Sequence, residues 1–301
     1  MSVRPTWIAV DWGTTHLRAW AMDGAKVLAK ASSESGMAAL DRDGFEPALL
    51  DLLAPWDVGD HINVVACGMV GARQGWAEAP YAAVPCTPLG AGFTQAPVRD
   101  PRLSVHIVPG VKQDRPADVM RGEETQIAGF LSQRKDFDGV LCLPGTHTKW
   151  VHVSAEEIVS FQTAMTGEIF GLLTDRSVLR HSVAGEGWDD AAFADAVTDS
   201  MSRPEALAAR LFGLRAEGLL NDLAAQTARA RLSGLLIGAE LAAARPYWLG
   251  REVALIGAPA LTALYRAALS AQGVAAVRHD GGEMTRAGLI AAHAKLKETA
   301  Q

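Results

Sequence analysis

A glycine–threonine turn near the start of the chain carries residues suited to phosphate chemistry. The stretch "DWGTT" places Asp11 at the end of an apolar run and follows it with Gly13, Thr14 and Thr15. Glycine lets the backbone approach a phosphate closely, and threonine adds a hydroxyl and its own N–H. A carboxylate beside such a turn could hold the water shell of Mg²⁺, so Asp11 is a candidate metal residue. The alternative is a hairpin in which Asp11 only caps its own turn.

A second turn repeats this pattern in the middle of the chain. In "LPGTHTKW", Gly145 and Thr146 match Gly13 and Thr14 at an offset of 132 residues. An apolar run precedes each turn and an alternating run follows it, which indicates an internal duplication. Two such turns could bind one nucleotide polyphosphate from both sides. His16 and His147, beside the turns, are too sparse for a metal cluster and are predicted to be polar turn residues.

A third small-residue junction lies near the C-terminus. In "LIGAPALTALYRAAL", Gly257 and Ala258 stand where an apolar strand meets a helix. Small residues there let the backbone approach a flat ring such as adenine, so both are candidate nucleotide-binding residues. The alternative is a close contact between the helix and the strand.

The elements that must position these turns form two similar series. Strands are expected at 6–10, 17–22 and 26–31, then a helix at 44–56 and a further strand at 62–68. A glycine- and proline-rich loop follows, then a strand near 104–110 and a helix opening at 120–131. The series restarts at 139, continues with a helix-rich stretch over about 190–245, and ends with a helix over 282–297. We expect an N-terminal domain over 1–118 and a C-terminal domain over 119–301.

Composition limits the classes of partner. The chain has 301 residues, with 28 basic and 34 acidic side chains and no basic block, which disfavours nucleic acid or an anionic membrane surface. No signal pattern and no apolar run long enough to span a bilayer is visible. The three cysteines lack metal-type spacing and are expected to be free thiols in a reducing, cytoplasmic compartment. A homo-oligomeric state is left open.

The three turn motifs occur in the order of the phosphate and adenosine motifs of the sugar kinase, heat-shock ATPase and actin superfamily. Several longer words make the chain resemble the 2-dehydro-3-deoxygalactonokinase family nearly end to end: "DWGTTHLRAW", "CGMVGARQGW", "VPGVKQDRPADVMRGEETQ", "LPGTHTKW", "MTGEIFGLL" and "LSGLLIGAEL". The resemblance implies an α/β fold of two ribonuclease-H-like domains that close over a cleft. It also implies transfer of the γ-phosphoryl group of ATP, with Mg²⁺, to the 6-hydroxyl of 2-dehydro-3-deoxy-D-galactonate.

The second turn departs from the superfamily pattern at one position. Leu143 stands opposite Asp11, where many members have an acidic residue. Metal support from the second turn is therefore not expected. Lys149 could supply positive charge there, or it could be a solvated strand residue.

The resemblance also places a catalytic carboxylate near the helix that links the two domains. That carboxylate accepts the proton of the attacking hydroxyl. The segment "DVMRGEETQIAG" offers Glu123, Glu124 and Asp118, which we rank in that order, with Asp11 as the alternative base. "RGEE" also resembles a helix of exopolyphosphatases. Alternatively, both glutamates only favour the helix dipole.

An acidic substrate calls for a cation and polar donors. The loop "GARQGWAEAPY" offers Arg73, Gln74, Trp76 and Tyr81. Arginine binds carboxylates bidentately, and tryptophan offers a sugar an apolar face. Alternatively, Arg73 pairs with a surface acid such as Glu78.

Two further places could contribute to the site. Arg18 lies on the second strand and either reaches the substrate or is a sheet-face residue. Thr166 and Gly167 begin a helix and could face phosphate; alternatively, Thr166 is only the N-cap of that helix, with Glu168 in its first turn.

Three other functions share parts of these motifs. A polyphosphate or nucleotide phosphohydrolase would use the turns and the "GEE" helix and would release ADP from ATP without a sugar acid. An actin-type ATPase would assemble with nucleotide and would leave Arg73 without a role. A kinase for another 2-keto-3-deoxy sugar acid differs only in substrate.

Overall fold

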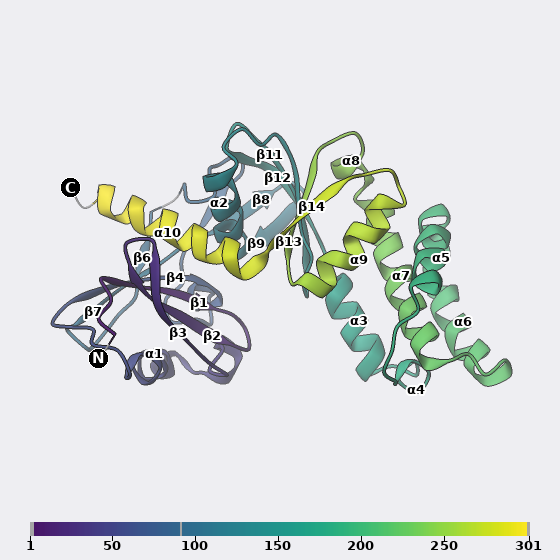
Figure 1. Cartoon of the computed structure of the whole chain (residues 1–301), viewed down its shortest axis with the longest axis horizontal. Coiled ribbons are helices and arrows are strands. Elements are labelled where there is room, and N and C mark those ends of the chain that lie inside the picture. The colour runs from purple at the N-terminus through teal and green to yellow at the C-terminus, as the bar shows by residue number, and fades with distance from the viewer. Residues whose placement is uncertain (1–2, 91, 300–301) are drawn as a thin grey trace. The chain divides into compact units, whose positions relative to one another are not determined.

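The computed structural model describes residues 3–90 and 92–299, which divide into two compact units. The first unit consists of Met1–Phe137, Val153–Ser160 and Gly281–Gln301, and the second of Asp138–His152 and Phe161–Asp280. Figure 1 labels the elements of both. No helix in the described part of the chain is long and apolar enough to cross a bilayer.

A mixed six-stranded sheet forms the centre of the first unit. Its strands are ordered β3-β2-β1-β4-β7-β6, and β1 is antiparallel to β2 and parallel to β4. The strands are β1 Trp7–Trp12, β2 Leu17–Asp23, β3 Lys26–Ser33, β4 Ile62–Gly68, β6 Thr94–Gln95 and β7 Leu103–Ile107. The register pairs Asp11 with Arg18 on one side and with Cys67 on the other, so polar side chains gather at one end of the sheet.

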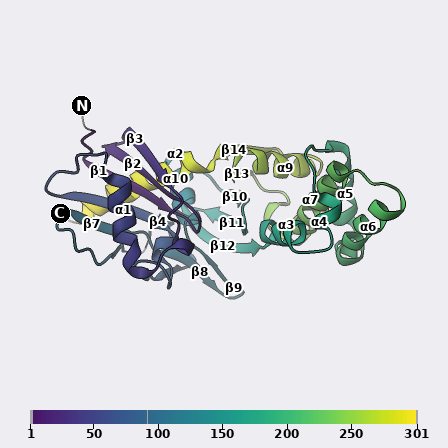
Figure 2. The ribbon, with the colours of Figure 1, turned by 90° about the horizontal axis from the view of Figure 1, so that it is seen from below.

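The two faces of this sheet are covered by different helices. Because β1 is central, its residues alternate between the two faces and nearly all are buried. Ile8 and Val10 pack with α1 (Phe45–Leu53), whereas Trp7 and Ala9 pack with α10 (Gly281–Thr299). Figure 2 shows these two helices on opposite sides of the strands.

The second sheet repeats the order of the first. Its five strands are ordered β12-β11-β10-β13-β14, which matches β3-β2-β1-β4-β7 strand for strand. They are β10 Gly139–Leu143, β11 Thr148–Ser154, β12 Glu157–Ala164, β13 Val253–Gly257 and β14 Ala276–Asp280. When the five matching strands of each sheet are numbered along the chain, they lie in the order 3-2-1-4-5, which is the strand order of a ribonuclease-H-like domain. The predicted fold class is therefore confirmed, and the duplication is visible as two sheets of one order.

Helices make up most of the rest of the second unit. They are α3 Thr166–Asp175, α4 Arg180–Val183, α5 Asp190–Ser202, α6 Leu207–Leu220, α7 Ala225–Ala243, α8 Arg245–Trp248 and α9 Pro259–Ser270. Figures 1 and 2 show α5, α6 and α7 side by side. Gly234 and Gly238 allow α5 and α7 to approach closely, because a Cβ at either position would lie within 2.6 Å of an α5 carbonyl oxygen. Short 3₁₀ helices occur at Met37–Ala39, Arg42–Gly44, Met69–Gly71 and Pro204–Ala206.

The units do not divide at residue 118, where the sequence placed the boundary. Helix α2 (Glu123–Gln133) belongs to the first unit because it packs along α10. Two glycines permit this contact: a Cβ at Gly129 would lie 2.0 Å from the Met284 carbonyl oxygen, and one at Gly288 would lie 1.8 Å from that of Thr125. Both helices therefore belong to the first unit.

A small sheet replaces part of the predicted loop. Its order is β5-β8-β9, formed by Tyr81–Ala83, Gly110–Asp114 and Ala117–Met120. Asp118 consequently lies on β9 and not on the helix that follows.

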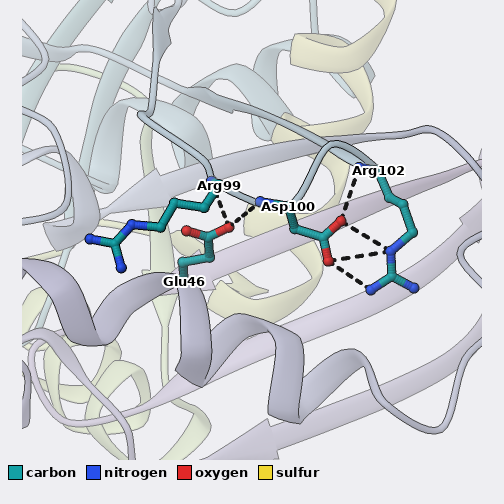
Figure 3. Close-up of polar contacts among 4 residues, drawn as sticks. All are labelled: Glu46, Arg99, Asp100 and Arg102. Atoms are coloured by element: carbon teal, nitrogen blue, oxygen red, sulfur yellow. Dashed lines mark hydrogen bonds and ion pairs between the residues drawn. The ribbon is translucent and has the colours of Figure 1, made fainter.

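Polar contacts fix the loop that leads into β7 (Figure 3). Glu46 of α1 accepts the backbone N–H groups of Arg99 and Asp100 at 2.8 and 2.7 Å. Asp100 in turn accepts the side chain of Arg102, which lowers the pKa of its carboxyl to about 2. The loop is thereby attached to α1, on the side of the sheet that holds the main core of this unit.

Candidate active site

The first turn is held by backbone contacts and leaves its threonines exposed. Gly13 N–H donates to the His16 carbonyl at 2.9 Å, and the Thr14 carbonyl accepts from Ala38 N–H at 2.9 Å. A Cβ at Gly36 would lie 2.2 Å from the backbone of Thr15, so only glycine allows this close contact. The hydroxyls of Thr14 and Thr15 remain at the surface, as a phosphate-binding turn requires.

Asp11 forms an ion pair across the sheet. Its Oδ2 lies 2.6 Å from Nη2 of Arg18, and the two side chains are 13% and 50% exposed. Burial raises the pKa of Asp11, and the neighbouring Arg18 guanidinium opposes that rise. Arg18 is thus an orienting partner of Asp11 that still has half of its side chain accessible.

A second carboxylate lies close to the same strand ends but is sealed from solvent. Glu124 is 0% exposed, accepts Gly122 N–H at 2.6 Å and accepts the Thr125 hydroxyl at 2.9 Å. Burial, together with neighbouring Glu123, raises the pKa of Glu124 to about 8. Burial also raises the pKa of the Cys67 thiol, and the charges of Asp11 and Glu124 raise it further. The interpretation that Glu124 faces a substrate is corrected: it is a buried group at the start of α2.

Glu123 is the glutamate that retains access. It is half-buried, and its Oε2 accepts the backbone N–H of Arg121 at 3.0 Å. Asp118, third in the sequence ranking, accepts its neighbour Val119 N–H on β9. Among the three carboxylates of this segment, Glu123 is therefore the one that lies on the first turn of α2 and keeps access to solvent.

The predicted substrate loop contains both surface and core residues. Arg73 and Gln74 are exposed, and Nε of Arg73 lies 3.5 Å from Glu78, the alternative partner expected from the sequence. Tyr81 is 36% exposed, with the Arg121 guanidinium 4.4 Å from its ring centre. Trp76 is corrected. It is 3% exposed, packs in the main core, and donates its indole N–H to the Pro97 carbonyl.

The residues around Asp11 fit a magnesium ion that is bound mainly by phosphates. Mg²⁺ commonly takes one or two protein carboxylates and keeps several waters. Because Arg18 occupies Oδ2, Oδ1 of Asp11 is the remaining ligand oxygen. A Cβ at residue 68 would lie 3.6 Å from this oxygen, and Gly68 leaves that space open. No cluster of three His, Cys, Asp or Glu suited to a metal occurs among residues 3–90 and 92–299, so a protein-only cage is not present there.

The second turn lies against the N-terminus of α3. Glu168 N–H donates to the Thr146 carbonyl at 2.9 Å, and His147 pairs with the Glu168 carboxylate at 2.6 Å. A Cβ at Gly167 would lie 2.2 Å from the Gly145 carbonyl oxygen, so this contact depends on glycine. The helix has Met165 as its N-cap, and Thr166 is its first residue. Thr166 is thus inside the helix and is not its cap.

A pocket of about 710 Å³ opens beside this turn, wholly within the second unit. It lies among α3, α7 and α9, which Figures 1 and 2 show close together. One end is formed by Gly145, Thr146, Thr166 and Gly167. The remaining wall is mostly apolar with three polar side chains: Phe170, Trp188, Asp190, Arg229, Ser233, Leu236, Ile237, Ala260, Leu261, Leu264 and Tyr265. A turn and a helix N-terminus joined to an apolar chamber form an arrangement that suits a nucleotide.

Two sequence interpretations change in the second unit. Lys149 is only 4% exposed, so the solvated-strand alternative is wrong. In the described part of the chain the pocket is lined by Ala260, Leu261 and Leu264 of α9 rather than by Gly257 and Ala258. Gly257 instead gives close packing, since a Cβ there would lie 3.1 Å from the Pro144 carbonyl oxygen.

The sequence interpretation missed the residues that α7 contributes. Arg229, Ser233, Leu236 and Ile237 line the pocket from one face of this helix. Glu240, one turn further on, is a charged residue inside an otherwise apolar helical run. That isolated charge was the available signal for a buried polar group.

Comparison with known proteins identifies relatives of this chain. A model of the 2-keto-3-deoxy-galactonokinase family matches residues 11–292. A Rhizobium meliloti (strain 1021) protein named a probable 2-dehydro-3-deoxygalactonokinase is 39% identical over 300 residues, which cover 97% of this chain and 98% of that protein. The 2-dehydro-3-deoxygalactonokinase of Escherichia coli (strain K12) is 36% identical over 290 residues, with 94% and 96% covered.

A solved structure agrees over the whole fold. The crystal structure of a Sinorhizobium meliloti protein, described as a candidate 2-dehydro-3-deoxygalactonokinase, has a TM-score of 0.91 at 39% identity. The alignment covers 96% of this chain and 99% of that one. With the family model spanning nearly the whole sequence, the chain belongs to the 2-keto-3-deoxy-galactonokinase family.

Proposed function

We propose that this chain transfers the γ-phosphoryl group of ATP to the 6-hydroxyl of 2-dehydro-3-deoxy-D-galactonate, a step of galactonate catabolism. Family membership supports the reaction class and the substrate. The observation that carries the proposal in this structure is the pocket of the second unit, where an apolar chamber ends at a phosphate-type turn and a helix N-terminus. A nucleotide needs both features.

The adenosine of ATP is proposed to occupy the apolar chamber, with the phosphates at the turn. Since α3 begins at Thr166, the N–H groups of Thr166 and Gly167 have no partner within their own helix. They and the backbone of Gly145 and Thr146 would donate to phosphate oxygens at the positive end of the helix dipole. Lys149, on the strand after the turn, is the proposed source of positive charge.

The first unit is proposed to supply the other phosphate turn and the metal residue. Gly13, Thr14 and Thr15 would donate to the phosphates, and Asp11 would hold Mg²⁺ through Oδ1 while Arg18 fixes its orientation. The metal, when bound, neutralises charge that develops on the transferring group.

Glu123 is the proposed general base. It would accept the proton of the 6-hydroxyl as the oxygen attacks the γ-phosphorus, which leaves ADP as the other product. Glu124 is a poor base at neutral pH, because a pKa of about 8 keeps it mostly protonated and its side chain has no exposed surface. Its carboxyl instead accepts backbone and hydroxyl groups at the first turn of α2.

The sugar acid is proposed to bind through polar groups of the first unit. Arg73 would exchange its weak, exposed contact with Glu78 for a bidentate bond to the substrate carboxylate. Gln74 and Tyr81 would bind substrate hydroxyls, and the accessible half of Arg18 offers a further donor. Trp76 has a supporting role, since its ring packs behind this loop in the core.

An ADP-release assay with a panel of 2-keto-3-deoxy sugar acids tests the proposal. We expect ADP release to require a sugar acid, to be fastest with 2-dehydro-3-deoxy-D-galactonate, and to yield a 6-phosphate by ³¹P–¹H NMR. The Asp11→Asn variant is the matched inactive control. Equally fast ADP release without any sugar acid would indicate a phosphohydrolase and would overturn the proposal.

A further inference from the structure

A buried carboxylate lies directly behind the nucleotide pocket. Glu240 of α7 is 6% exposed, and its side-chain hydrogen-bond donors in the described part of the chain are Thr166, Tyr265, Trp150 and Thr148. Its Oε1 accepts the indole N–H of Trp150 at 2.8 Å, and its Oε2 accepts the hydroxyl of Tyr265 at 2.7 Å. Trp150 and Tyr265 are themselves 0% and 1% exposed.

Two threonines extend these contacts to the phosphate end of the pocket. The Thr166 hydroxyl, on the first residue of α3, hydrogen-bonds with the Glu240 carboxylate. Thr148, two residues after Thr146 of the turn, hydrogen-bonds with the Tyr265 hydroxyl at 3.0 Å. We call Glu240, Trp150, Tyr265, Thr148 and Thr166 the Glu240 network. It connects β11, α3, α7 and α9 through a single side chain.

Burial raises the pKa of Glu240, and the hydrogen bonds from Thr166, Tyr265, Trp150 and Thr148 oppose that rise. The partners in this network suit a carboxylate that accepts from all of them. An ionised carboxylate only accepts hydrogen bonds, while the indole N–H only donates and the hydroxyls can all donate. Such charge-assisted bonds are shorter and stronger than neutral ones. Taking a charge out of water is unfavourable, and an apolar side chain of similar volume would fill the space without that cost. Two of the donors, Thr166 and Tyr265, line the pocket. The buried carboxylate therefore holds residues of the pocket wall in place.

We propose that Glu240 is a positioning residue for the nucleotide phosphates. By holding the Thr166 hydroxyl and, through Tyr265, the strand that follows the second turn, it fixes the turn and the α3 N-terminus in one arrangement. Their backbone N–H groups then converge on the phosphates without reorganisation when the nucleotide binds. This inference rests on the proposed function, because it assigns that pocket to ATP.

Two substitutions of Glu240 distinguish the effect of its hydrogen bonds from the effect of the space that its side chain fills. Glu240→Gln keeps the volume and one acceptor oxygen, but its NH₂ group can only donate, so the network loses one of its two acceptor oxygens. Glu240→Leu removes all acceptors. We expect the Kd for a non-hydrolysable ATP analogue with Mg²⁺ to rise about tenfold in Glu240→Gln and further in Glu240→Leu. KM for the sugar acid should stay within about twofold, because none of the network residues belongs to the proposed sugar-acid site.

Ser200→Ala is the matched control for a structural effect. Ser200 is 0% exposed on α5 and donates to the Leu235 carbonyl of α7 at 2.7 Å, so it joins the same helix without lining the pocket. We expect this variant to lower Tm while the nucleotide Kd stays within about twofold. Tyr265→Phe, which removes one donor from Glu240 and keeps the ring, should weaken nucleotide binding by about threefold even if Glu240→Leu does not fold.

Isothermal titration calorimetry of each variant, with Tm measured in parallel, distinguishes the outcomes. If the wild-type chain does not bind the nucleotide, the proposed function fails and the inference fails with it. If the wild type binds but both Glu240→Gln and Tyr265→Phe bind equally well, the positioning role is overturned while the proposed function stands. Lowered Tm with unchanged Kd in those two variants would mark Glu240 as purely structural and would also overturn the inference.

Discussion

Replacing Glu124 with glutamine should change how the stability of the first unit depends on pH. Glu124 has a pKa of about 8 in the folded chain, raised by burial and by Glu123, against an ordinary value of 4.5. At a pH between these two pKa values, Glu124 keeps its proton in the folded state and releases it in the unfolded state. The stability linked to this proton is fully present below about pH 4.5 and is lost as pH rises through about 8.

The size of this effect follows from the same two values. The difference between about 8 and 4.5 corresponds to an upper bound of about 5 kcal/mol of unfolding free energy. Glutamine resembles the protonated acid, since its oxygen can accept Gly122 N–H while its NH₂ group donates to Thr125. The Glu124→Gln variant should therefore match the wild type near pH 5 and exceed its stability by several kcal/mol near pH 9.

Hydrogen exchange followed by mass spectrometry can measure this locally. The opening free energy of α2 and β4 peptides is compared between wild type and Glu124→Gln over about pH 5 to 9. Glu123→Gln is the comparison variant on the same helix turn. We expect it to keep a weaker form of the wild-type pH dependence, because it removes the Glu123 charge that raises the pKa of Glu124 but leaves the larger effect of burial in place. Parallel curves for wild type and Glu124→Gln would refute the argument, because they would show that Glu124 binds no extra proton in the folded state.

Three further substitutions test the proposed site. Asp11→Asn should lower kcat by about 10²-fold or more in the kinase assay with little change in Tm, because the carboxylate acts on the transferring group; full activity would remove its metal role. Arg73→Ala should raise KM for the sugar acid about tenfold at similar kcat, and an unchanged KM would move the carboxylate site elsewhere. Gly167→Ala should weaken ATP binding and lower the unfolding free energy by about 1–3 kcal/mol, because its Cβ would lie 2.2 Å from the Gly145 carbonyl oxygen. Gly171→Ala, on the same helix with nothing within 4 Å of the added Cβ, is the control and should do neither.

Local patterns were sufficient to predict the strands and the two turns. The alternation in Leu17–Asp23 and the apolar run in Trp7–Trp12 each determine a strand from neighbouring residues alone. The repeat at an offset of 132 residues predicted an internal duplication, which the structure shows as two sheets of one strand order. The pairing of Asp11 with Arg18 was not predicted, although the register of the two adjacent strands accounts for it.

Features that depend on distant contacts could not be predicted in this way. The glycine- and proline-rich surroundings of Trp76 are typical of a loop, yet its ring is buried against Trp12 and Phe45, which come from other segments. Glu123 and Glu124 look equivalent in sequence and differ only in what packs around them. Glu240 acquires its role from Trp150 and Tyr265, which are far away in the chain. The position of α10 against α2 likewise depends on glycines of both helices.

A crystal structure of the chain with Mg²⁺ and a non-hydrolysable ATP analogue would show where the nucleotide binds. We expect the adenosine among α3, α7 and α9, in the pocket that Phe170 and Leu264 line. We also expect phosphate oxygens within hydrogen-bond distance of the N–H groups of Thr146 and Gly167. A nucleotide bound outside this pocket, or phosphates that do not contact the second turn, would contradict this expectation.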